Sequence, residues 1–122
     1  MPPKQPAIKK IMPALTTKQI NVHLKSIPDW SKRARTICRT FKFEGFLMSI
    51  AFVRRIAKRA QKINHHPDID IRFDQVNLTL TTHDEGGITE KDFSLARQCD
   101  VVFSRFWSRD QPGFQAKTKP SR

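Results

Sequence analysis

Apolar residues recur every three or four positions in three segments of the chain, which predicts three amphipathic helices. Thr16 or Thr17 can cap the first helix, and Pro28 ends it. Its apolar positions are Ile20, Leu24 and Ile27. The second helix begins at Phe46 and must end before Pro67, because the proline ring disfavours helical geometry in the residue ahead of it. Its expected buried stripe consists of Phe46, Ile50, Val53, Ala57 and Ala60.

Two further regions alternate apolar and polar residues, as half-buried strands do. In RARTICRTFKF, residues 33–43, the positions Ile37, Phe41 and Phe43 share one face. Residues 69–80 then predict an antiparallel hairpin with a turn at Asp74 and Gln75. Its alternating apolar residues are Ile69, Ile71 and Phe73, followed by Val76, Leu78 and Leu80. A further short strand is expected near Trp30.

The third helix opens at Thr89, with Ile88 and Phe93 placed as a hydrophobic staple and Asp92 in the capping-box position. Its apolar arc is broad enough that we expect part of it to meet another subunit. The arc comprises Phe93, Leu95, Ala96, Cys99, Val102, Phe103, Phe106 and Trp107. The element order predicts an α+β two-layer sandwich, a small antiparallel four-stranded sheet with about three helices packed on one face.

The length of 122 residues fits one domain, which we expect over residues 15–107. Residues 1–14 are rich in proline and lysine and predict a flexible basic arm, and residues 108–122 predict a flexible basic tail. No apolar run is long enough to cross a bilayer, and the N-terminus lacks the apolar core of a secretory signal. We therefore expect a cytoplasmic protein, with organellar import or nuclear presence left open.

The net charge of +12 is distributed unevenly along the sequence. Residues 16–63 carry +10, whereas residues 64–104 carry −5. Three of the four histidines, His65, His66 and His83, lie in this acidic part. We therefore expect the basic surface and the histidines to serve different purposes. The basic side of the second helix is most simply a solvated face, and nucleic acid is not expected as a partner.

The histidine cluster has three interpretations from the residues alone. Three imidazoles and a water can bind zinc, but adjacent histidines seldom reach one ion and no H-E-x-x-H spacing occurs. Histidines at element ends can instead cap carbonyl groups. In the third interpretation they are general acids and bases, because the imidazole pKa of about 6.5 suits proton transfer at neutral pH.

Nucleophilic and phosphate-binding chemistries find little support in the sequence. There is no G-x-S-x-G elbow and no Gly-rich phosphate loop, and Gly86 and Gly87 are isolated turn residues. Cys38 and Cys99 are far apart in sequence, lie beside no histidine, and are expected to be reduced, buried thiols. An enzyme built from these residues is expected to move protons without a bound cofactor or metal.

The motifs INHHPD and VNLTLTTHDEGGITEKD resemble the signature of the pterin-4a-carbinolamine dehydratases: H-H-P, a strand ending in T-H, then G-G, a hydroxyl residue and an aspartate. The resemblance extends upstream through Trp30 and FKFEGF, and covers residues 15–106. It implies dehydration of 4a-hydroxytetrahydrobiopterin to a quinonoid dihydropterin in tetrahydrobiopterin recycling, coupled to an aromatic amino acid hydroxylase. The pterin would be substrate and not cofactor.

The resemblance also implies roles for individual residues. His65 and His83 would form the acid–base pair, and His66 would position the pterin. Asp92 would orient a histidine or bind the ring, besides capping its helix, and Trp30 would lie near the pocket unless it is simply a core residue.

Relatives are dimers or tetramers, and some are partners of a transcription factor. A homodimer or homotetramer is therefore expected here, with a non-catalytic binding or regulatory module as the alternative function. The sequence departs from many relatives at Ile69, where they carry an aromatic residue, and at Gln61, where they carry an acidic one. Both departures bear on pterin affinity more than on the reaction.

Overall fold

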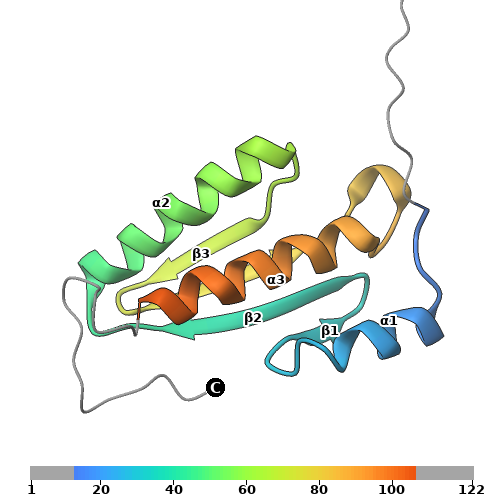
Figure 1. Ribbon diagram of the computed structural model, residues 1–122, viewed down its shortest axis with the longest axis horizontal. Helices are drawn as coiled ribbons and strands as arrows, with labels where there is room; N and C mark the ends of the chain where they lie inside the picture. Colours follow the sequence, from blue (N-terminus) through green and yellow to red (C-terminus); the bar gives the residue numbers. More distant parts are fainter. Residues whose placement is uncertain (1–12, 107–122) are drawn as a thin grey trace, which may run out of the picture.

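The computed structural model describes residues 13–106 of the chain (Figure 1). In chain order the elements are α1 (Thr17–Leu24), β1 (Ser31–Arg33), β2 (Thr36–Lys42), α2 (Phe46–Ile63), β3 (Asp68–Arg72), β4 (Gln75–Leu80), the 3-10 turn η1 (His83–Glu85) and α3 (Glu90–Arg105). The predicted basic arm lies outside the described residues except for Pro13 and Ala14. Trp107 and the predicted tail lie outside them altogether.

The four strands form one antiparallel sheet in the order β1-β2-β4-β3. Helices α2 and α3 lie side by side over one face of the sheet, and α1 lies beside β1 (Figure 1). The register pairs Ile37 with Leu80 and Phe41 with Val76, so the apolar side chains of β2 and β4 face the helices together. The predicted α+β architecture is confirmed, and β1 is the short strand expected near Trp30.

The core between the helices and the sheet is built largely from phenylalanine rings. Phe52 of α2 packs between Phe41 and Phe43, with ring centroids 4.8 and 5.0 Å away. Phe103 of α3 meets Phe41 and Phe43 edge-on at 5.0 and 5.3 Å. Edge-to-face pairs of this kind stabilise a core beyond the area they bury, by about 0.5–1.5 kcal/mol each.

The predicted buried stripe of α2 was wrong by about one position around the helix. The buried residues are Ser49, Phe52, Ile56 and Ala60, whereas Phe46, Ile50 and Ala57 are exposed. Both stripes are largely apolar and each contains one phenylalanine, so periodicity alone could not choose between them. Phe52 lies in the middle of the helix, where its ring meets Phe41 and Phe43 of the sheet side, whereas Phe46 is the first residue of α2 and stays exposed.

The broad arc of α3 is covered within the chain. Its members among the described residues are all buried: Phe93, Leu95, Ala96, Cys99, Val102, Phe103 and Phe106. The expectation that part of this arc meets another subunit was therefore wrong, because α3 contacts the sheet on one side and α2 on another. The homo-oligomer stays a prediction that the arc does not support.

The hairpin and the cysteines depart from expectation in detail. The β3–β4 turn falls at Phe73 and Asp74, one residue earlier than predicted, and Phe73 is exposed because it lies in this turn with a left-handed φ of 53° and not in β3. Both cysteines are free thiols, but only Cys99 is buried; Cys38 is half-buried. Burial raises the pKa of the Cys99 thiol to about 12, so this group stays protonated at physiological pH. None of the described helices is long and apolar enough to cross a membrane.

Two isoleucines of α2 test which face of the helix packs on the sheet. Ile56 is 0% exposed and Ile50 is 38% exposed. We expect Ile56→Ala to lower the free energy of unfolding by about 2–5 kcal/mol, because it leaves a cavity in the core. Ile50→Ala, the same change two turns away, should cost less than about 1 kcal/mol. Urea denaturation measures both, and equal losses would contradict the packing described.

Candidate active site

His65 and His66 follow the end of α2, where the chain turns sharply. Asn64 adopts a left-handed conformation with φ 54° and caps the helix. Asparagine tolerates this conformation better than most residues, and Pro67 prevents the helix from continuing. The backbone N–H of His65 then donates to the carbonyl of Ala60 at 3.0 Å. This turn directs the His65 ring inward, where it is 9% exposed, and leaves His66 exposed.

Asp92 receives the His65 ring inside the protein. Its carboxylate is 0% exposed, and its Oδ1 lies 2.6 Å from His65 Nε2. The other oxygen, Oδ2, accepts hydrogen bonds from the backbone N–H of Thr89 at 2.9 Å and from the hydroxyl of Thr82 at 2.8 Å. The predicted capping role and the predicted contact with a histidine are thus both present, one on each carboxylate oxygen.

The two threonines form a directed chain of hydrogen bonds with Asp92. A hydroxyl has a single hydrogen, and that of Thr82 goes to Asp92. The contact of 2.8 Å between the Thr82 and Thr89 hydroxyls must therefore be donated by Thr89. The Thr89 hydroxyl in turn accepts from the backbone N–H of Lys91 at 3.1 Å. We call His65, Thr82, Thr89 and Asp92 the Asp92 network; all four residues are buried.

The network favours one tautomer of His65. Two donors, the Thr82 hydroxyl and the Thr89 backbone N–H, point at Oδ2 of Asp92, which suits an ionised carboxylate, and an ionised carboxylate can only accept hydrogen bonds. Nε2 of His65 then carries the hydrogen of the contact with Oδ1, and Nδ1 is left without one. A buried carboxylate that orients an imidazole in this way is the arrangement found behind many catalytic histidines.

The other two predicted histidines are exposed. His66 Nε2 lies 3.0 Å from the side-chain oxygen of Gln61, one of the two positions at which the sequence departs from many relatives. His83 begins η1, directly after Thr82, and a left-handed Gly86 with φ 74° closes this turn. An amide at position 61 leaves His66 without the neighbouring negative charge that an acidic residue would supply.

The three histidines are connected through the Asp92 network and not by direct contact. His65 adjoins His66 in the chain, and it reaches the neighbour of His83 through Asp92 and Thr82. No hydrogen bond, ion pair or ring contact among residues 13–106 joins His65 or His66 directly to His83. His65 lines a hollow of about 240 Å³ with Lys91, Ser94 and Arg97. His83 lines one of about 310 Å³ with Arg35, Thr36 and Thr81.

Trp30, predicted to lie near the pocket, is a buried core residue. Its indole N–H donates to Asp100 at 2.8 Å, and Arg39 binds the same carboxylate oxygen at 2.6 Å. Asp100 lies eight residues beyond Asp92 on α3, about 12 Å along the helix axis. Burial raises the pKa of the Asp100 carboxyl above its ordinary value, although Trp30 and Arg39 act in the opposite direction. No described contact connects Trp30 with the histidines, so its substrate-binding role stays a prediction.

Sequence reasoning missed the threonines. Thr82 and Thr89 complete the Asp92 network, yet only Thr89 was singled out, and only as a helix cap. The doubled hydroxyl in T-T-H just after the end of β4 was an available signal, because the alternation of the strand, continued by two residues, places Thr82 on the same face as buried Leu80. Within residues 13–106 no three His, Cys, Asp or Glu side chains are grouped to hold a metal ion.

The fold and these contacts define an α+β protein with a buried histidine–aspartate pair at the junction of α2, β4 and α3. The sequence model described as "Pterin 4 alpha carbinolamine dehydratase" matches residues 13–102. The chain belongs to this family.

Similar proteins agree with this assignment. A protein of Chloroflexus aurantiacus that is 50% identical over 91 residues is named, provisionally, pterin-4-alpha-carbinolamine dehydratase; the match covers 75% of this chain and 98% of that protein. One of Mycobacteroides abscessus with the same provisional name is 46% identical, with 77% and 100% covered.

Two solved structures are also similar. A transcriptional coactivator/pterin dehydratase from Brucella melitensis has 34% identity and a TM-score of 0.71, and the match covers 73% of this chain and 97% of that one. A pterin dehydratase-like protein identified as a RuBisCO assembly factor in the alpha-carboxysome has 21% identity and a TM-score of 0.51, with 61% and 86% covered. At that identity the second structure supports the fold alone.

Two threonines, one on β4 and one just after it, test the Asp92 network. We expect Thr82→Val to lower the free energy of unfolding by about 1–3 kcal/mol, because it removes a buried donor to Asp92 and leaves Thr89 without its acceptor. Thr79→Val on β4 is the control, because no hydrogen bond of its hydroxyl is found among the described residues, and it should change stability by less than about 0.5 kcal/mol. Urea denaturation measures the difference; an equal effect of the two substitutions would show that the network contributes nothing.

Proposed function

We propose that this protein dehydrates a pterin 4a-carbinolamine to the quinonoid dihydropterin by histidine general acid–base catalysis. The observation that carries the proposal is the hydrogen bond between His65 Nε2 and the buried carboxylate of Asp92. Family membership supports the substrate class. The substrate named by the resemblance is 4a-hydroxytetrahydrobiopterin, formed by an aromatic amino acid hydroxylase, and no metal or bound cofactor takes part.

The reaction needs two proton transfers. The bond between C4a and the hydroxyl oxygen breaks, and that oxygen takes a proton and leaves as water. The N5–H proton goes to a base, and its electron pair forms the new double bond between N5 and C4a. One acid and one base, at different sides of the ring, therefore complete the turnover without an oxidant or a nucleophile.

His65 and His83 are assigned as this pair. Nδ1 of His65 is free to exchange a proton while Asp92 holds the ring and stabilises its positive form. His83 has the solvent access that a group exchanging protons with water needs. His66, held by Gln61, is assigned to positioning the pterin, and Asp92 acts as a positioning residue for His65.

The two assigned histidines should each be needed for the rate. We expect His65→Ala and His83→Ala to slow dehydration by about a hundredfold or more, the usual scale for a general acid or base. Stopped-flow formation of the quinonoid dihydropterin measures the rate. The control is His23→Gln, because His23 pairs with Glu90 and stacks on Phe93 outside the Asp92 network, and its rate should stay near that of the wild type. Wild-type rates in both alanine variants would refute the mechanism.

The tautomer of His65 tests the role of Asp92 separately from the rate. The ring ¹⁵N shifts of His65 should show Nε2 protonated and Nδ1 bare. We expect Asp92→Asn to disturb this pattern and to slow dehydration by about a hundredfold or more, because an amide can donate to Nε2 and favour the wrong tautomer. A purely structural role for Asp92 would lower stability but leave the tautomer and the rate per folded molecule unchanged.

The alternative function is a non-catalytic binding or regulatory module of the same fold. It is favoured by the basic residues of α2 that form no ion pair within residues 13–106, and by the coactivator description of the Brucella melitensis relative. The same stopped-flow measurement separates the two. Formation of quinonoid dihydropterin no faster than in buffer, together with partner binding that weakens steeply with salt, would support the module and not the enzyme.

A further inference from the structure

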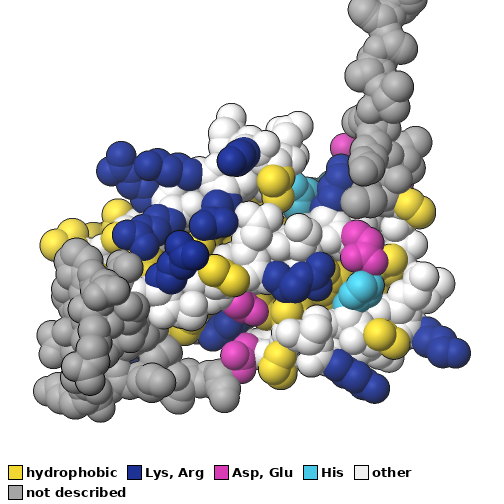
Figure 2. Space-filling view, in the orientation of Figure 1, with side chains coloured by type: hydrophobic (Ala, Val, Ile, Leu, Met, Phe, Trp, Pro, Cys, Tyr) yellow, Lys and Arg dark blue, Asp and Glu magenta, His cyan; other side chains and the backbone are white. Residues whose placement is uncertain are grey.

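A groove lined by basic residues runs between α2 and α3, and the proposed reaction does not use it. It encloses about 800 Å³, and its lining residues are Arg55, Lys58, Arg59, Lys62, Ile63, Gln98, Val102 and Arg105. Five of these eight residues are basic and none is acidic. Figure 2 shows the lysine and arginine side chains gathered over α2 and the adjoining side of α3. We call this surface the basic groove.

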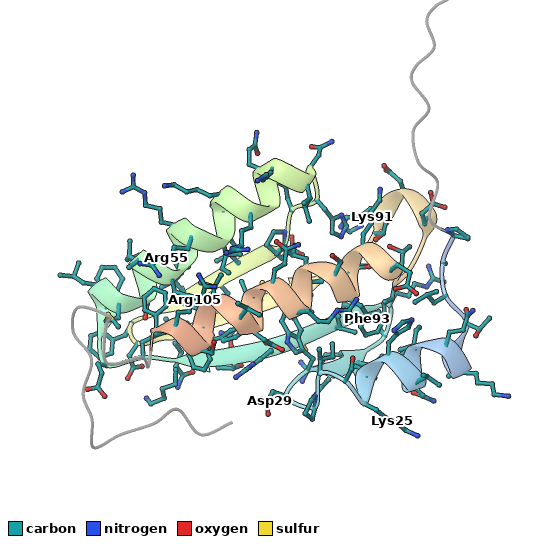
Figure 3. All side chains as sticks on the ribbon, in the orientation of Figure 1. Lys25, Asp29, Arg55, Lys91, Phe93 and Arg105 are labelled. Carbon is teal, nitrogen blue, oxygen red and sulfur yellow. The ribbon has the colours of Figure 1, made fainter. Side chains whose placement is uncertain are left out.

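The basic groove continues into the hollow beside His65. Ile63 lines both, and the hollow adds Lys91 and Arg97 to the row of cations. Figure 3 marks the two ends: Arg55 and Arg105 lie together at one, and Lys91 lies at the other. From Lys91 to Arg105 the row follows α3 for fourteen residues, about 21 Å. The charge count along the sequence had suggested separate places for the basic surface and the histidines, but the fold sets them side by side.

The five basic residues of the basic groove and the two of the hollow, Lys91 and Arg97, form no ion pair within residues 13–106. The single carboxylate that lines the hollow, Glu90, is engaged by His23 at 2.8 Å. Arg55 is held in place by stacking over the Phe106 ring at 4.8 Å. Like charges gathered in this way repel one another, and a bound anion relieves that repulsion.

We propose that the substrate of the His65 site is a pterin with an anionic extension, and that the basic groove binds the extension. This inference rests on the proposed function, because it places the pterin ring beside His65. A pterin with a short neutral side chain would leave most of the groove empty. Phosphate and carboxylate groups on a chain of several atoms fit its length and its charge, and Arg and Lys both bind them well.

The groove lacks what base recognition in nucleic acids requires. Single-stranded nucleic acids are bound by exposed aromatic side chains on which bases stack. Within residues 13–106 the lining includes no aromatic residue, and Phe106 is buried beneath Arg55. The described lining offers positive charge but no aromatic side chain on which a base could stack, and Ile63 links the groove to the hollow that His65 lines. Both features favour an anionic extension of the substrate over a nucleic acid.

Equilibrium binding of matched pterin pairs tests the proposal. One pair is 7,8-dihydroneopterin and its triphosphate, and the other is dihydrofolate with one or with several glutamates. We expect the more anionic member of at least one pair to bind about tenfold more tightly at low salt, equivalent to a few exposed ion pairs. The pair with the larger ratio identifies phosphate or carboxylate as the extension. The ratio should fall towards one as salt is raised to about 0.2 M, because screening shortens the range of the charges to under about 10 Å.

Charge-neutral variants locate the effect. In the double variant Lys58→Gln/Lys62→Gln, the affinity ratio between the two pterins of a pair should fall most of the way to one. The matched control is Lys18→Gln/Lys25→Gln, which removes the same charge from an exposed lysine of α1 and from its exposed C-cap residue, away from the groove (Figure 3 labels Lys25). Its affinity ratio should stay near that of the wild type. Ratios near one in the wild type, or equal ratios in the two double variants, overturn the proposal. So does a single-stranded DNA oligonucleotide that binds through Lys58 and Lys62 while both pterin ratios stay near one.

The rate assay separates this inference from the proposed function. If the protein accelerates carbinolamine dehydration but the affinity ratio is one, the proposed dehydratase function stands and the binding of an anionic extension in the basic groove is refuted. A ratio of about ten without any acceleration would refute catalysis, and with it the claim that the anionic pterin is a substrate.

Discussion

The buried carboxylate of Asp92 is the constraint on which the rest of the site depends. A carboxylate with no exposure to water must be surrounded by donors, since burying it unpaired would cost several kcal/mol. The donors come from three elements: His65 after α2, Thr82 after β4, and the first turn of α3. Satisfying one side chain therefore fixes the relative positions of the two main helices and the central strand. Removal of any donor leaves the carboxylate short of a partner, so stability and site geometry are coupled here.

The same carboxylate explains why the site can be both rigid and reactive. Its Oδ2 is used for the capping box and for Thr82, which are structural tasks, while Oδ1 is left for the imidazole. The imidazole thus meets an acceptor that cannot rotate away, because the other oxygen is held by two hydrogen bonds. His66 and His83 are exposed, and neither contacts a buried carboxylate among the described residues. The site therefore combines one histidine fixed by a buried carboxylate with two on the surface.

Sequence patterns predicted the elements well where one signal acted alone. Pro67 fixed the end of α2, Thr89 with Asp92 fixed the start of α3, and the alternation around Leu78 fixed β4. Prediction failed where two packings were nearly equal in apolar content, as with the two stripes of α2, because the choice depends on which side chains the sheet presents. The prediction that part of the α3 arc meets another subunit failed for a related reason. A sequence shows how much apolar surface a helix has, but not how many neighbouring elements of the same chain will cover it.

The residues of the site could be named from motifs, but their connections could not. Asp92 lies 27 residues from His65, and nothing in the spacing shows which of its oxygens faces the ring or that Thr82 supports it. The electrostatic surroundings were harder still to foresee. His65 belongs to an acidic stretch of sequence, yet α2 ends two residues before it and carries the lysines and arginines of the basic groove, while α3 adds Lys91 and Arg97. A charge count along the chain ignores the helix that precedes a site. In the folded protein these cations lie beside the hollow that His65 lines, so an anionic ligand approaching that hollow would meet them first.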